Sequence, residues 1–289
     1  MQKLIKIMFA LVIIALIISS IFLYSIYYRV EHVRINYKSI YNEKITESLN
    51  DVTLGFISDI RYNEFMNYDR LEKMIKKYQN TNTDVCIFGG DLFSDRLLVD
   101  INEEVISSLT TLLKNIEAPL GKFAILGDCD TKNEEHKKIV EQILTDADFE
   151  IISNNLIQIR TSQHSDSLSL IGVDAYINNE VNISSHSSQL EKENFRLLVT
   201  HCPDFIQQGI IDISNFDVIL SGHSLGGQIY LPLLGGMVHQ EGAIKYYHGA
   251  YQINQTKLFV SNGLGTINID MRLFAPPEII ILKLKKVNK

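Results

Sequence analysis

The sequence predicts an α/β fold that follows an N-terminal membrane helix, and three observations support this. Apolar strand patterns alternate with amphipathic helix patterns along most of the chain. An uncharged run, "IMFALVIIALIISSIFLYSIYY", lies at 7–28 near its beginning. Several strands end directly in a carboxylate or an imidazole. The length of 289 residues leaves enough chain after the apolar run for one large domain.

The uncharged run at 7–28 predicts a transmembrane helix. About 20 apolar residues span the hydrocarbon core of a bilayer, which is roughly 30 Å thick. Lys3 and Lys6 precede the run, Arg29 and Arg34 follow it, and three tyrosines near its end stand where an aromatic belt belongs. The alternatives are a cleaved signal peptide and a buried core helix. No small-residue cleavage site follows the run and no polar stripe interrupts it, so we favour an uncleaved anchor.

Residues 1–29 are therefore expected to form the membrane anchor, and residues 30–289 the domain that it carries. Basic residues flank the run equally on both sides, so their distribution does not decide the orientation. We favour a single-pass protein of the cell membrane with its domain outside the cytoplasm. The stretch 30–41 alternates in part and predicts a first strand close to the bilayer surface.

Strand and helix patterns alternate in the rest of the chain. Apolar stripes of helical period predict helices at 68–78, 103–116 and 133–147. Short apolar runs predict strands at 52–58, 85–90, 122–127, 156–160, 168–173, 195–200 and 217–222, and in the stretches "KLFVSNG" and "EIIILKLKK". This alternation indicates an α/β architecture with much of its sheet buried.

Composition narrows the classes of partner. The net charge is −7 and no basic stripe is present, so we expect no nucleic-acid partner. The three cysteines, Cys86, Cys129 and Cys202, are widely spaced and odd in number, which argues against a disulfide framework. Cys86 lies in an apolar strand and is expected to be a small core residue.

Polar side chains follow five of the predicted strands. In chain order they are Asp59, then Asp91 with Asp95, then Asp128 with Cys129 and Asp130, then His201, and finally His223. A single aspartate after a strand is often a cap or a turn residue, and a single histidine is often structural. Sites in open α/β sheets form at the carboxyl ends of strands, so five such ends indicate one site. Two imidazoles with several carboxylates suit a divalent metal.

Five motifs carry a resemblance to a known family: "SDIR", "GGDLFSD", "LGDCD", "VTHCPD" and "SGHSLGGQIYLPLLG". In this order they resemble the motifs of the calcineurin-like metallophosphoesterases, specifically their membrane-anchored bacterial branch. That family carries Asp-x-His, Gly-Asp-x-x-Asp, Gly-Asn-His-Asp, a lone His and Gly-His-x-His. "LFVSNGLGT", Arg272 and "PPEIIILKL" resemble the C-terminal signature of the branch. The resemblance implies two mixed β-sheets packed as a sandwich and flanked by helices.

The resemblance also implies two-metal hydrolysis of a phosphoester, in which two divalent ions clamp the phosphate. Asp91 matches the carboxylate that bridges the ions, and Asp59 matches a ligand of the first ion. Asp128 stands where the family has an asparagine ligand of the second ion, and His201 and His223 match its two imidazoles. The implied cofactor is a divalent ion such as Mn, Fe, Zn or Mg.

Three positions depart from the family pattern. Arg61 and Leu225 replace the two histidine ligands of the first ion, and Cys129 replaces the catalytic histidine. An arginine is always protonated and a leucine has no donor atom, so neither ligates a metal. We therefore expect one ion to bind tightly and a second to bind weakly or not at all. Arg61, Cys129 and Asp130 are the candidate catalytic residues.

These residues leave three functions open. The first is a slow hydrolase in which Arg61 replaces the charge of an ion on the phosphoryl oxygens. The second is a non-catalytic module that keeps one metal and binds a phosphorylated ligand or a partner protein. The third has no metal, only salt bridges from Arg61 to Asp59 and Asp128. One ion, three carboxylates and Arg61 sum to a charge near zero, which favours the module, whereas the fold favours the hydrolase. We favour the hydrolase.

The remaining expectations concern substrate and neighbouring residues. A membrane tether with little linker favours a lipid or cell-envelope phosphoester, with a soluble nucleotide as the alternative. Cys129 and Cys202 each follow a site residue, and two free thiols are favoured over a disulfide. Asp174 matches a recurring acidic position of the branch and is given no chemistry. His239 and His248 are interpreted as surface-loop residues in preference to parts of a lid.

Overall fold

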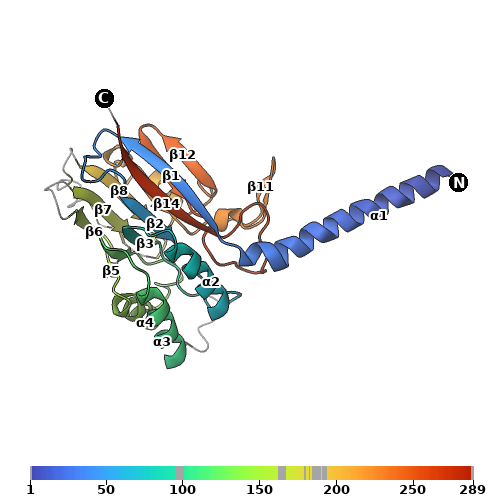
Figure 1. Cartoon of the computed structure of the whole chain (residues 1–289), viewed down its shortest axis with the longest axis horizontal. Coiled ribbons are helices and arrows are strands. Elements are labelled where there is room, and N and C mark those ends of the chain that lie inside the picture. The colour runs from blue at the N-terminus through green and yellow to red at the C-terminus, as the bar shows by residue number, and fades with distance from the viewer. Residues whose placement is uncertain are drawn as a thin grey trace.

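Two six-stranded sheets form the centre of the domain (Figure 1). The structure, a computed structural model, describes residues 2–94, 101–161, 167–178, 180–181, 183, 190 and 194–287. Helices cover one sheet, and a long helix projects from the domain at its N-terminal end. The predicted α/β sandwich of two mixed sheets, flanked by helices and preceded by an apolar helix, is confirmed.

The first sheet has the strand order β1-β14-β2-β3-β4-β5. Its strands are β1 (Arg34–Asn42), β14 (Glu278–Lys286), β2 (Thr53–Ile57), β3 (Val85–Phe88), β4 (Lys122–Ala124) and β5 (Glu150–Ile151). β14 runs antiparallel to β2, and the other neighbours are parallel. The C-terminal strand β14 thus lies second from the edge of the sheet, between β1 and β2.

The second sheet has the order β12-β13-β9-β8-β7-β6. Its strands are β12 (Gly249–Ile253), β13 (Thr256–Val260), β9 (Val218–Ser221), β8 (Phe195–Thr200), β7 (Ser167–Val173) and β6 (Asn155–Arg160). The two outer pairs are antiparallel and the inner pairs are parallel. A separate ribbon consists of β10 (Tyr230–Leu231) and β11 (Gly235–Gly236).

The core between the sheets is formed because side chains along each strand point alternately to its two faces. Leu54 and Phe56 of β2 pack with Leu197 and Val199 of β8 in one buried cluster, whereas Ile57 belongs to the cluster on the opposite face. Successive side chains of a strand point to opposite faces, so a strand buried on both faces reads as a continuous apolar run. This is why the strands were recognisable as short apolar segments.

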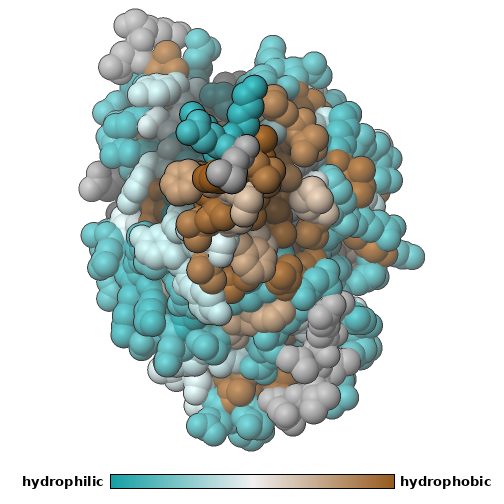
Figure 2. All heavy atoms as spheres, turned by 90° about the vertical axis from the view of Figure 1, so that its right-hand side faces the viewer, coloured by the Kyte–Doolittle hydropathy of each residue, from teal (hydrophilic) through white to brown (hydrophobic). Residues whose placement is uncertain are grey.

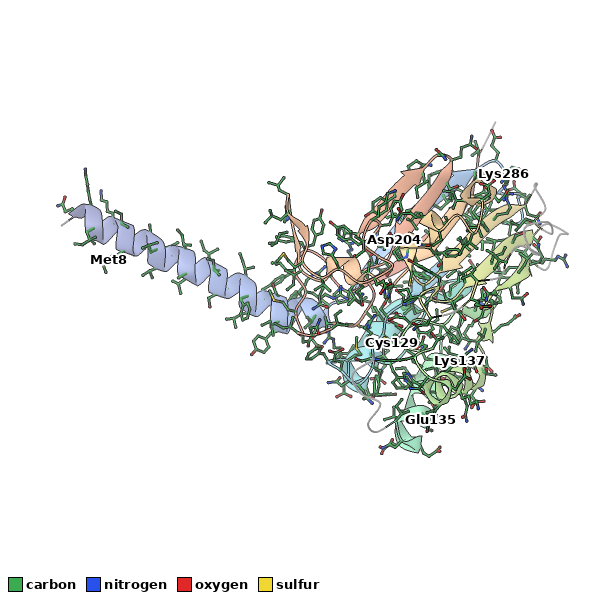
Figure 3. The ribbon with its side chains drawn as sticks, turned by 180° about the vertical axis from the view of Figure 1, so that it is seen from behind. Met8, Cys129, Glu135, Lys137, Asp204 and Lys286 are labelled. Carbon is green, nitrogen blue, oxygen red and sulfur yellow. The ribbon has the colours of Figure 1, made fainter. Side chains whose placement is uncertain are left out.

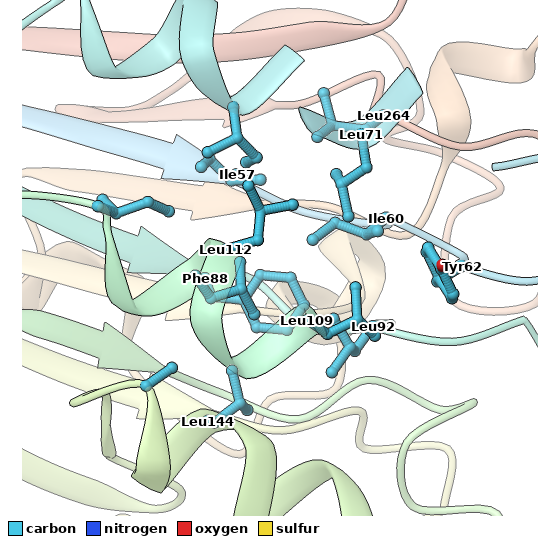
Figure 4. Close-up of a cluster of buried hydrophobic side chains, with 14 of the residues drawn as sticks. Ile57, Ile60, Tyr62, Leu71, Phe88, Leu92, Leu109, Leu112, Leu144 and Leu264 are labelled. Carbon is cyan, nitrogen blue, oxygen red and sulfur yellow. The ribbon is translucent and has the colours of Figure 1, made fainter. Parts of the chain in front are cut away.

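Three helices cover the outer face of the first sheet: α2 (Tyr68–Gln79), α3 (Glu103–Lys114) and α4 (Glu134–Asp146). Figure 4 shows their apolar side chains packed against those of the strands. Each helix begins after an asparagine whose side chain accepts a hydrogen bond from the backbone three residues on: Asn67, Asn102 and Asn133. Such caps contribute about 1 kcal/mol each. Short 3-10 turns lie at Pro203–Gln207 (η3), Ile213–Asn215 (η4) and Leu225–Gly227 (η5).

The N-terminal helix α1 (Gln2–Leu23) continues through η1 (Tyr24–Tyr28) and η2 (Arg29–Glu31) into the domain. Within the described part of the chain, this is the one helix long and apolar enough to cross a membrane, and none of its α1 residues is buried. Figure 3 shows Met8 far from the domain. The first strand starts at Arg34 and not at residue 30, because residues 29–31 are still helical.

Candidate metal centre

Five site residues follow the ends of five strands. Asp59 follows β2, Asp91 follows β3, Asp128 follows β4, His201 follows β8 and His223 follows β9. The first three strands belong to one sheet and the last two to the other. The structure brings the five side chains together at the carboxyl ends of the parallel strands, where the sequence placed them.

The loops that carry these side chains are held in an uncommon backbone conformation. Asp59, Arg61, Asp91 and His223 have φ values of 51°, 49°, 62° and 66°, in the left-handed region. A non-glycine residue there costs about 1–3 kcal/mol and persists only when its surroundings impose it. The sandwich therefore holds these loops in place, and strain of this kind is concentrated at functional sites.

Four donor atoms converge on one point. Asp128 Oδ1 lies 3.1 Å from His201 Nε2 and 2.9 Å from His223 Nδ1, and these two nitrogens are 3.2 Å apart. Asp91 Oδ2 lies 3.5 Å from His201 Nε2. Four ligands around one ion at about 2.1 Å stand about 3.4 Å apart when tetrahedral. These four residues therefore fit one divalent ion.

Backbone carbonyls orient both imidazoles toward this cluster. His201 Nδ1 donates to the carbonyl oxygen of Gly89 at 2.6 Å, and His223 Nε2 donates to that of Glu241 at 2.7 Å. A carbonyl only accepts, so the proton of each neutral ring is on the nitrogen that faces away from the cluster. The other nitrogen of each ring keeps its lone pair for a metal, as ligating histidines require.

A guanidinium lies beside this cluster, where the family pattern has an imidazole. Arg61 Nη2 is 2.5 Å from Asp91 Oδ2 and 3.7 Å from Asp59 Oδ1. Arg61 Nη1 donates to the Cys129 sulfur at 3.4 Å, and Nη2 donates to Gln240 Oε1 at 3.2 Å. Burial lowers the pKa of Arg61, but the neighbouring acidic groups, Asp91 first, outweigh it and raise the pKa well above its ordinary value. The group is a fixed cation.

The other two residues at the ligand positions of the family's first ion, Asp59 and Leu225, offer few atoms that could bind a metal. Asp59 Oδ2 accepts from the backbone N–H of His223 at 2.9 Å, and Asp59 Oδ1 has no hydrogen-bond partner among the described residues. Leu225 is buried, and its carbonyl accepts from Arg272 Nη1 at 2.6 Å. A first ion would thus share the Asp59 and Asp91 carboxylates with Arg61, and Arg61 and Leu225 offer it no imidazole.

Comparisons with known proteins identify the family of this chain. The sequence profile of the calcineurin-like phosphoesterases matches residues 52–227. The chain belongs to this family. It is 26% identical over 237 residues to the "uncharacterized metallophosphoesterase YkuE" of Bacillus subtilis, covering 80% of this chain and 78% of that one.

Two further relatives are longer than this chain. A Campylobacter jejuni metallophosphoesterase is 28% identical over 81% of this chain, which spans 59% of that protein. A zebrafish "transmembrane protein with metallophosphoesterase domain" is 24% identical over 84% of this chain, which spans 55% of that protein. These similarities extend well beyond the five motifs.

Cys129 takes the family's catalytic-histidine position as a buried thiol. Burial and the charge of Asp91 raise its pKa well above the ordinary value, so the thiol stays neutral. Figure 3 shows Cys129 inside the domain. Cys86, Cys129 and Cys202 are all free and buried, which confirms the expectation of free thiols and of a core position for Cys86.

Asp130 contacts backbone and not the metal cluster. Its carboxylate accepts from the N–H groups of Asp91 at 2.7 Å, Leu92 at 2.9 Å and Gly127 at 2.8 Å. It thereby connects the loop after β3 to the loop after β4. Asp130 was a catalytic candidate from its motif, but its contacts are those of a positioning residue for the family's metal loops.

The outlying candidates lie apart from the cluster. Asp174 is buried and accepts from Leu126 N–H at 2.8 Å and Ser153 Oγ at 2.7 Å, which is a structural role. His239 is exposed and packs edge-on against Tyr247, and His248 stacks on Tyr230. Asp95 lies outside the described residues.

Two residues of the site had no signal in the sequence. Gln240 accepts from Arg61, and its side-chain nitrogen donates to the carbonyl of His223. The carbonyl of Glu241 orients the His223 ring. Both lie in a loop far along the chain from the strand ends, and a backbone acceptor is independent of residue type. The family motifs do not include these positions.

Proposed function

We propose that this chain is a membrane-anchored phosphoester hydrolase that holds one divalent ion tightly, with Arg61 in the place of a second ion. One observation carries the proposal. The Arg61 guanidinium contacts the carboxylates of Asp59 and Asp91, next to the cluster of Asp91, Asp128, His201 and His223 that fits a single ion. The family contributes the class of reaction, phosphoester hydrolysis.

The ion would be held by Asp91, Asp128, His201 and His223, whose donor atoms lie close together. A bound divalent ion of this kind supplies Lewis acidity and makes water a stronger nucleophile near neutral pH. Asp128 keeps 28% of its side chain exposed, whereas the other three side chains are buried, so substrate approaches from the Asp128 side. Arg61 neutralises Asp59 and Asp91 and so lowers their repulsion of a phosphate.

The chain has no imidazole acid at the Cys129 position. A neutral thiol with a raised pKa is a poor proton donor to a departing alkoxide. Loss of a general acid typically costs about 10²–10⁴ in rate. We therefore expect slow turnover, with a preference for leaving groups that are already stable as anions.

The second candidate is a binding module without catalysis. One observation favours it: the Arg61 side chain is buried and already occupied by Asp91, Cys129 and Gln240. A guanidinium so engaged has little freedom to follow a phosphoryl group through a transition state. Such a module would keep one ion and bind a phosphorylated ligand or a partner protein.

The apolar helix α1 supports a location in the cell membrane. Its length and hydropathy suffice for one crossing, and one relative is named a transmembrane protein. We propose a single N-terminal anchor over residues 1–29, with the domain of residues 30–289 outside the cytoplasm. The proposed substrate is a phosphorylated lipid or small molecule of the envelope and not a nucleic acid, in keeping with the net charge of −7.

The test uses the full-length chain purified in detergent. Metal content is measured after dialysis, and hydrolysis of p-nitrophenyl phosphate is measured with added Mn²⁺ for the wild type, His201→Ala and His223→Ala. His32→Ala, an exposed histidine at the end of η2, is the matched control. We expect about one ion per wild-type chain, slow hydrolysis, and loss of both in the two site variants only.

The other outcomes separate the alternatives. One bound ion without any hydrolysis supports the binding module. Two tightly bound ions contradict the replacement of an ion by Arg61. No bound ion, with Asp59 and Asp91 satisfied by Arg61 alone, supports a cluster of salt bridges and contradicts the metal centre.

A further inference from the structure

The ribbon formed by β10 and β11 exposes apolar side chains to an unusual degree. At its tip Leu233 is fully exposed and Leu234 is 79% exposed, and Met237 follows at 62%. Phe274 and Ile269, on the neighbouring loop, are 60% and 42% exposed. Large apolar side chains gathered on one surface mark a contact with a partner or a membrane.

Hydrogen bonds join this ribbon to the neighbouring loop. The Tyr230 N–H donates to the Leu273 carbonyl at 2.8 Å, and the Leu273 N–H donates to the Gln228 carbonyl at 3.2 Å. The Gln228 side chain also donates to the carbonyls of Ile267 and Ile269, each at 2.9 Å. The segments 228–238 and 267–274 therefore form one unit, called here the apolar ledge.

The apolar ledge is attached to the base of the N-terminal helix. The Arg272 N–H donates to the carbonyl of Ser25 at 3.1 Å, and Ser25 is itself buried. Arg70 donates to the Val30 carbonyl at 2.8 Å and pairs with Asp270 of the ledge at 2.9 Å. The direction of the helix and the position of the ledge are thus fixed relative to each other.

The apolar ledge and the N-terminal helix lie on the same side of the molecule. In Figures 1 and 3 the β10–β11 ribbon stands beside the domain end of α1, on the side from which the helix leaves. Figure 2 views that side along the helix, so the apolar side chains gathered in its centre include those of α1 itself. Tyr24, Tyr27 and Tyr28 are exposed at the end of the helix, and tyrosines there mark the membrane interface.

We propose that the apolar ledge lies in the interface of the bilayer that α1 spans and forms a second contact between domain and membrane. This rests on the anchoring part of the proposed function. A lipid bilayer is the occupant, because the ledge is hydrogen-bonded to Ser25, which lies between the exposed Tyr24 and Tyr27 at the end of the apolar helix. A bilayer that α1 spans reaches this level without any partner protein.

Contact between the apolar ledge and the bilayer would favour one class of substrate. The ribbon connects the two halves of the site: Leu225 and His223 precede it, and Gln240 and Glu241, which contact Arg61 and His223, follow it. A ledge held in the lipid interface keeps these loops at the bilayer surface. The substrate class that this favours is a phosphoester carried by a membrane lipid, with its phosphate in the headgroup layer.

The absence of tryptophan from the chain provides a direct test. A single Leu234→Trp variant of the full-length protein is reconstituted into phosphatidylcholine–phosphatidylglycerol vesicles. Emission is compared without brominated lipid, with lipid brominated near the carboxyl end of its acyl chains for Leu234→Trp, and with lipid brominated near the chain ends for a tryptophan at the bilayer centre. Ile210→Trp, at an exposed apolar position in the loop between η3 and η4, is the matched control. Ile14→Trp reports on α1 itself.

We expect blue-shifted emission and strong quenching by brominated lipid for Leu234→Trp and Ile14→Trp, and neither for Ile210→Trp. An unquenched Leu234→Trp beside a quenched Ile14→Trp overturns the ledge contact and leaves the anchor standing. An unquenched Ile14→Trp overturns the anchor and the ledge contact together. Quenching by lipid does not depend on a bound metal or on turnover. The test of the ledge contact therefore stays valid even if the protein proves not to be a hydrolase.

Discussion

The Nη2 atom of Arg61 lies 2.5 Å from Oδ2 of Asp91, the residue that the sequence resemblance matches to the family's bridging carboxylate. The same guanidinium is 3.7 Å from Asp59 Oδ1. A covalently attached cation thus stands beside both carboxylates of the first-ion position. The Arg61 guanidinium therefore supplies a positive charge at this position without a bound metal ion, and unlike an ion it cannot dissociate.

Arg61→Met is expected to destabilise the metal-free protein. It leaves Asp59 and Asp91 buried without their cation, and breaking a buried pair typically costs about 3–5 kcal/mol. Added Mn²⁺ should restore part of the loss, because an ion can then bind between the two carboxylates. Thermal unfolding followed by circular dichroism, in EDTA and in Mn²⁺, measures both effects.

The matched control is Arg70→Met, which removes a buried arginine paired with Asp270 at 2.9 Å, away from the cluster. It should destabilise the protein without any rescue by Mn²⁺. Equal rescue of both variants would contradict a metal-like role for Arg61.

Asp128→Asn is expected to keep the tightly held ion and to bind phosphate better. The amide oxygen still faces His201 and His223 and is the ligand that the family pattern has there. Removing one negative charge should raise the affinity for inorganic phosphate about tenfold, or about 1.4 kcal/mol. Calorimetric titration with phosphate measures this. Asp212→Asn, an exposed site with the same change in net charge, should have no effect.

The thiols are expected to be unreactive in the native protein. Burial raises the pKa of Cys86 to about 12, and the pKa values of Cys129 and Cys202 are also raised by burial. A protonated, buried thiol reacts slowly with iodoacetamide. Mass spectrometry should find no labelled cysteine at mildly alkaline pH, and three after denaturation without reductant. Rapid native labelling of Cys129 would show that the thiol is accessible and ionised.

Gly127→Ala is expected to disrupt the cluster by contact with Asp91. A Cβ at this glycine would lie 2.0 Å from Asp91 Oδ1, so the carboxylate or the loop must move. Such overpacking costs about 1–3 kcal/mol and here displaces a metal ligand. Equilibrium dialysis with Mn²⁺ should show weaker binding. Gly209→Ala, where a Cβ would meet open space, should retain wild-type metal affinity.

His136 is expected to make stability fall in mild acid. Its Nδ1 donates to the Cys129 carbonyl at 2.9 Å, and its buried Nε2 has no hydrogen-bond partner in the described part of the chain. Burial lowers its pKa below the ordinary value of about 6.5, so the unfolded chain binds a proton first. Stability is therefore full above that ordinary value and is lost as the pH falls toward the folded-state pKa.

His136→Phe removes this titration and keeps a ring beside Phe93. The midpoint of urea unfolding should depend less on pH in the variant than in the wild type between about pH 7 and about pH 5. Parallel pH profiles of the two proteins would exclude His136 as the source.

Some elements could not be predicted from the sequence. β5, β10 and β11 have two residues each, too few to show a period of two, and β12 is largely exposed in a stretch interpreted as surface loop. Their pairing depends on neighbours that the fold supplies. The longer strands and helices were predictable, because burial on one or both faces imposes a repeating apolar pattern.

The sequence by itself determined the chemistry available to this protein. A strand that ends in Asp59 or His223 delivers that side chain to the sheet edge, and no fold can make ligands of Arg61 and Leu225. Only the tertiary structure decided that Arg61 reaches Asp91, that Asp130 binds backbone, that Gln240 joins the site, and that the β10–β11 ribbon stands beside α1. Such contacts depend on loop conformation and strand register, which many distant residues set together.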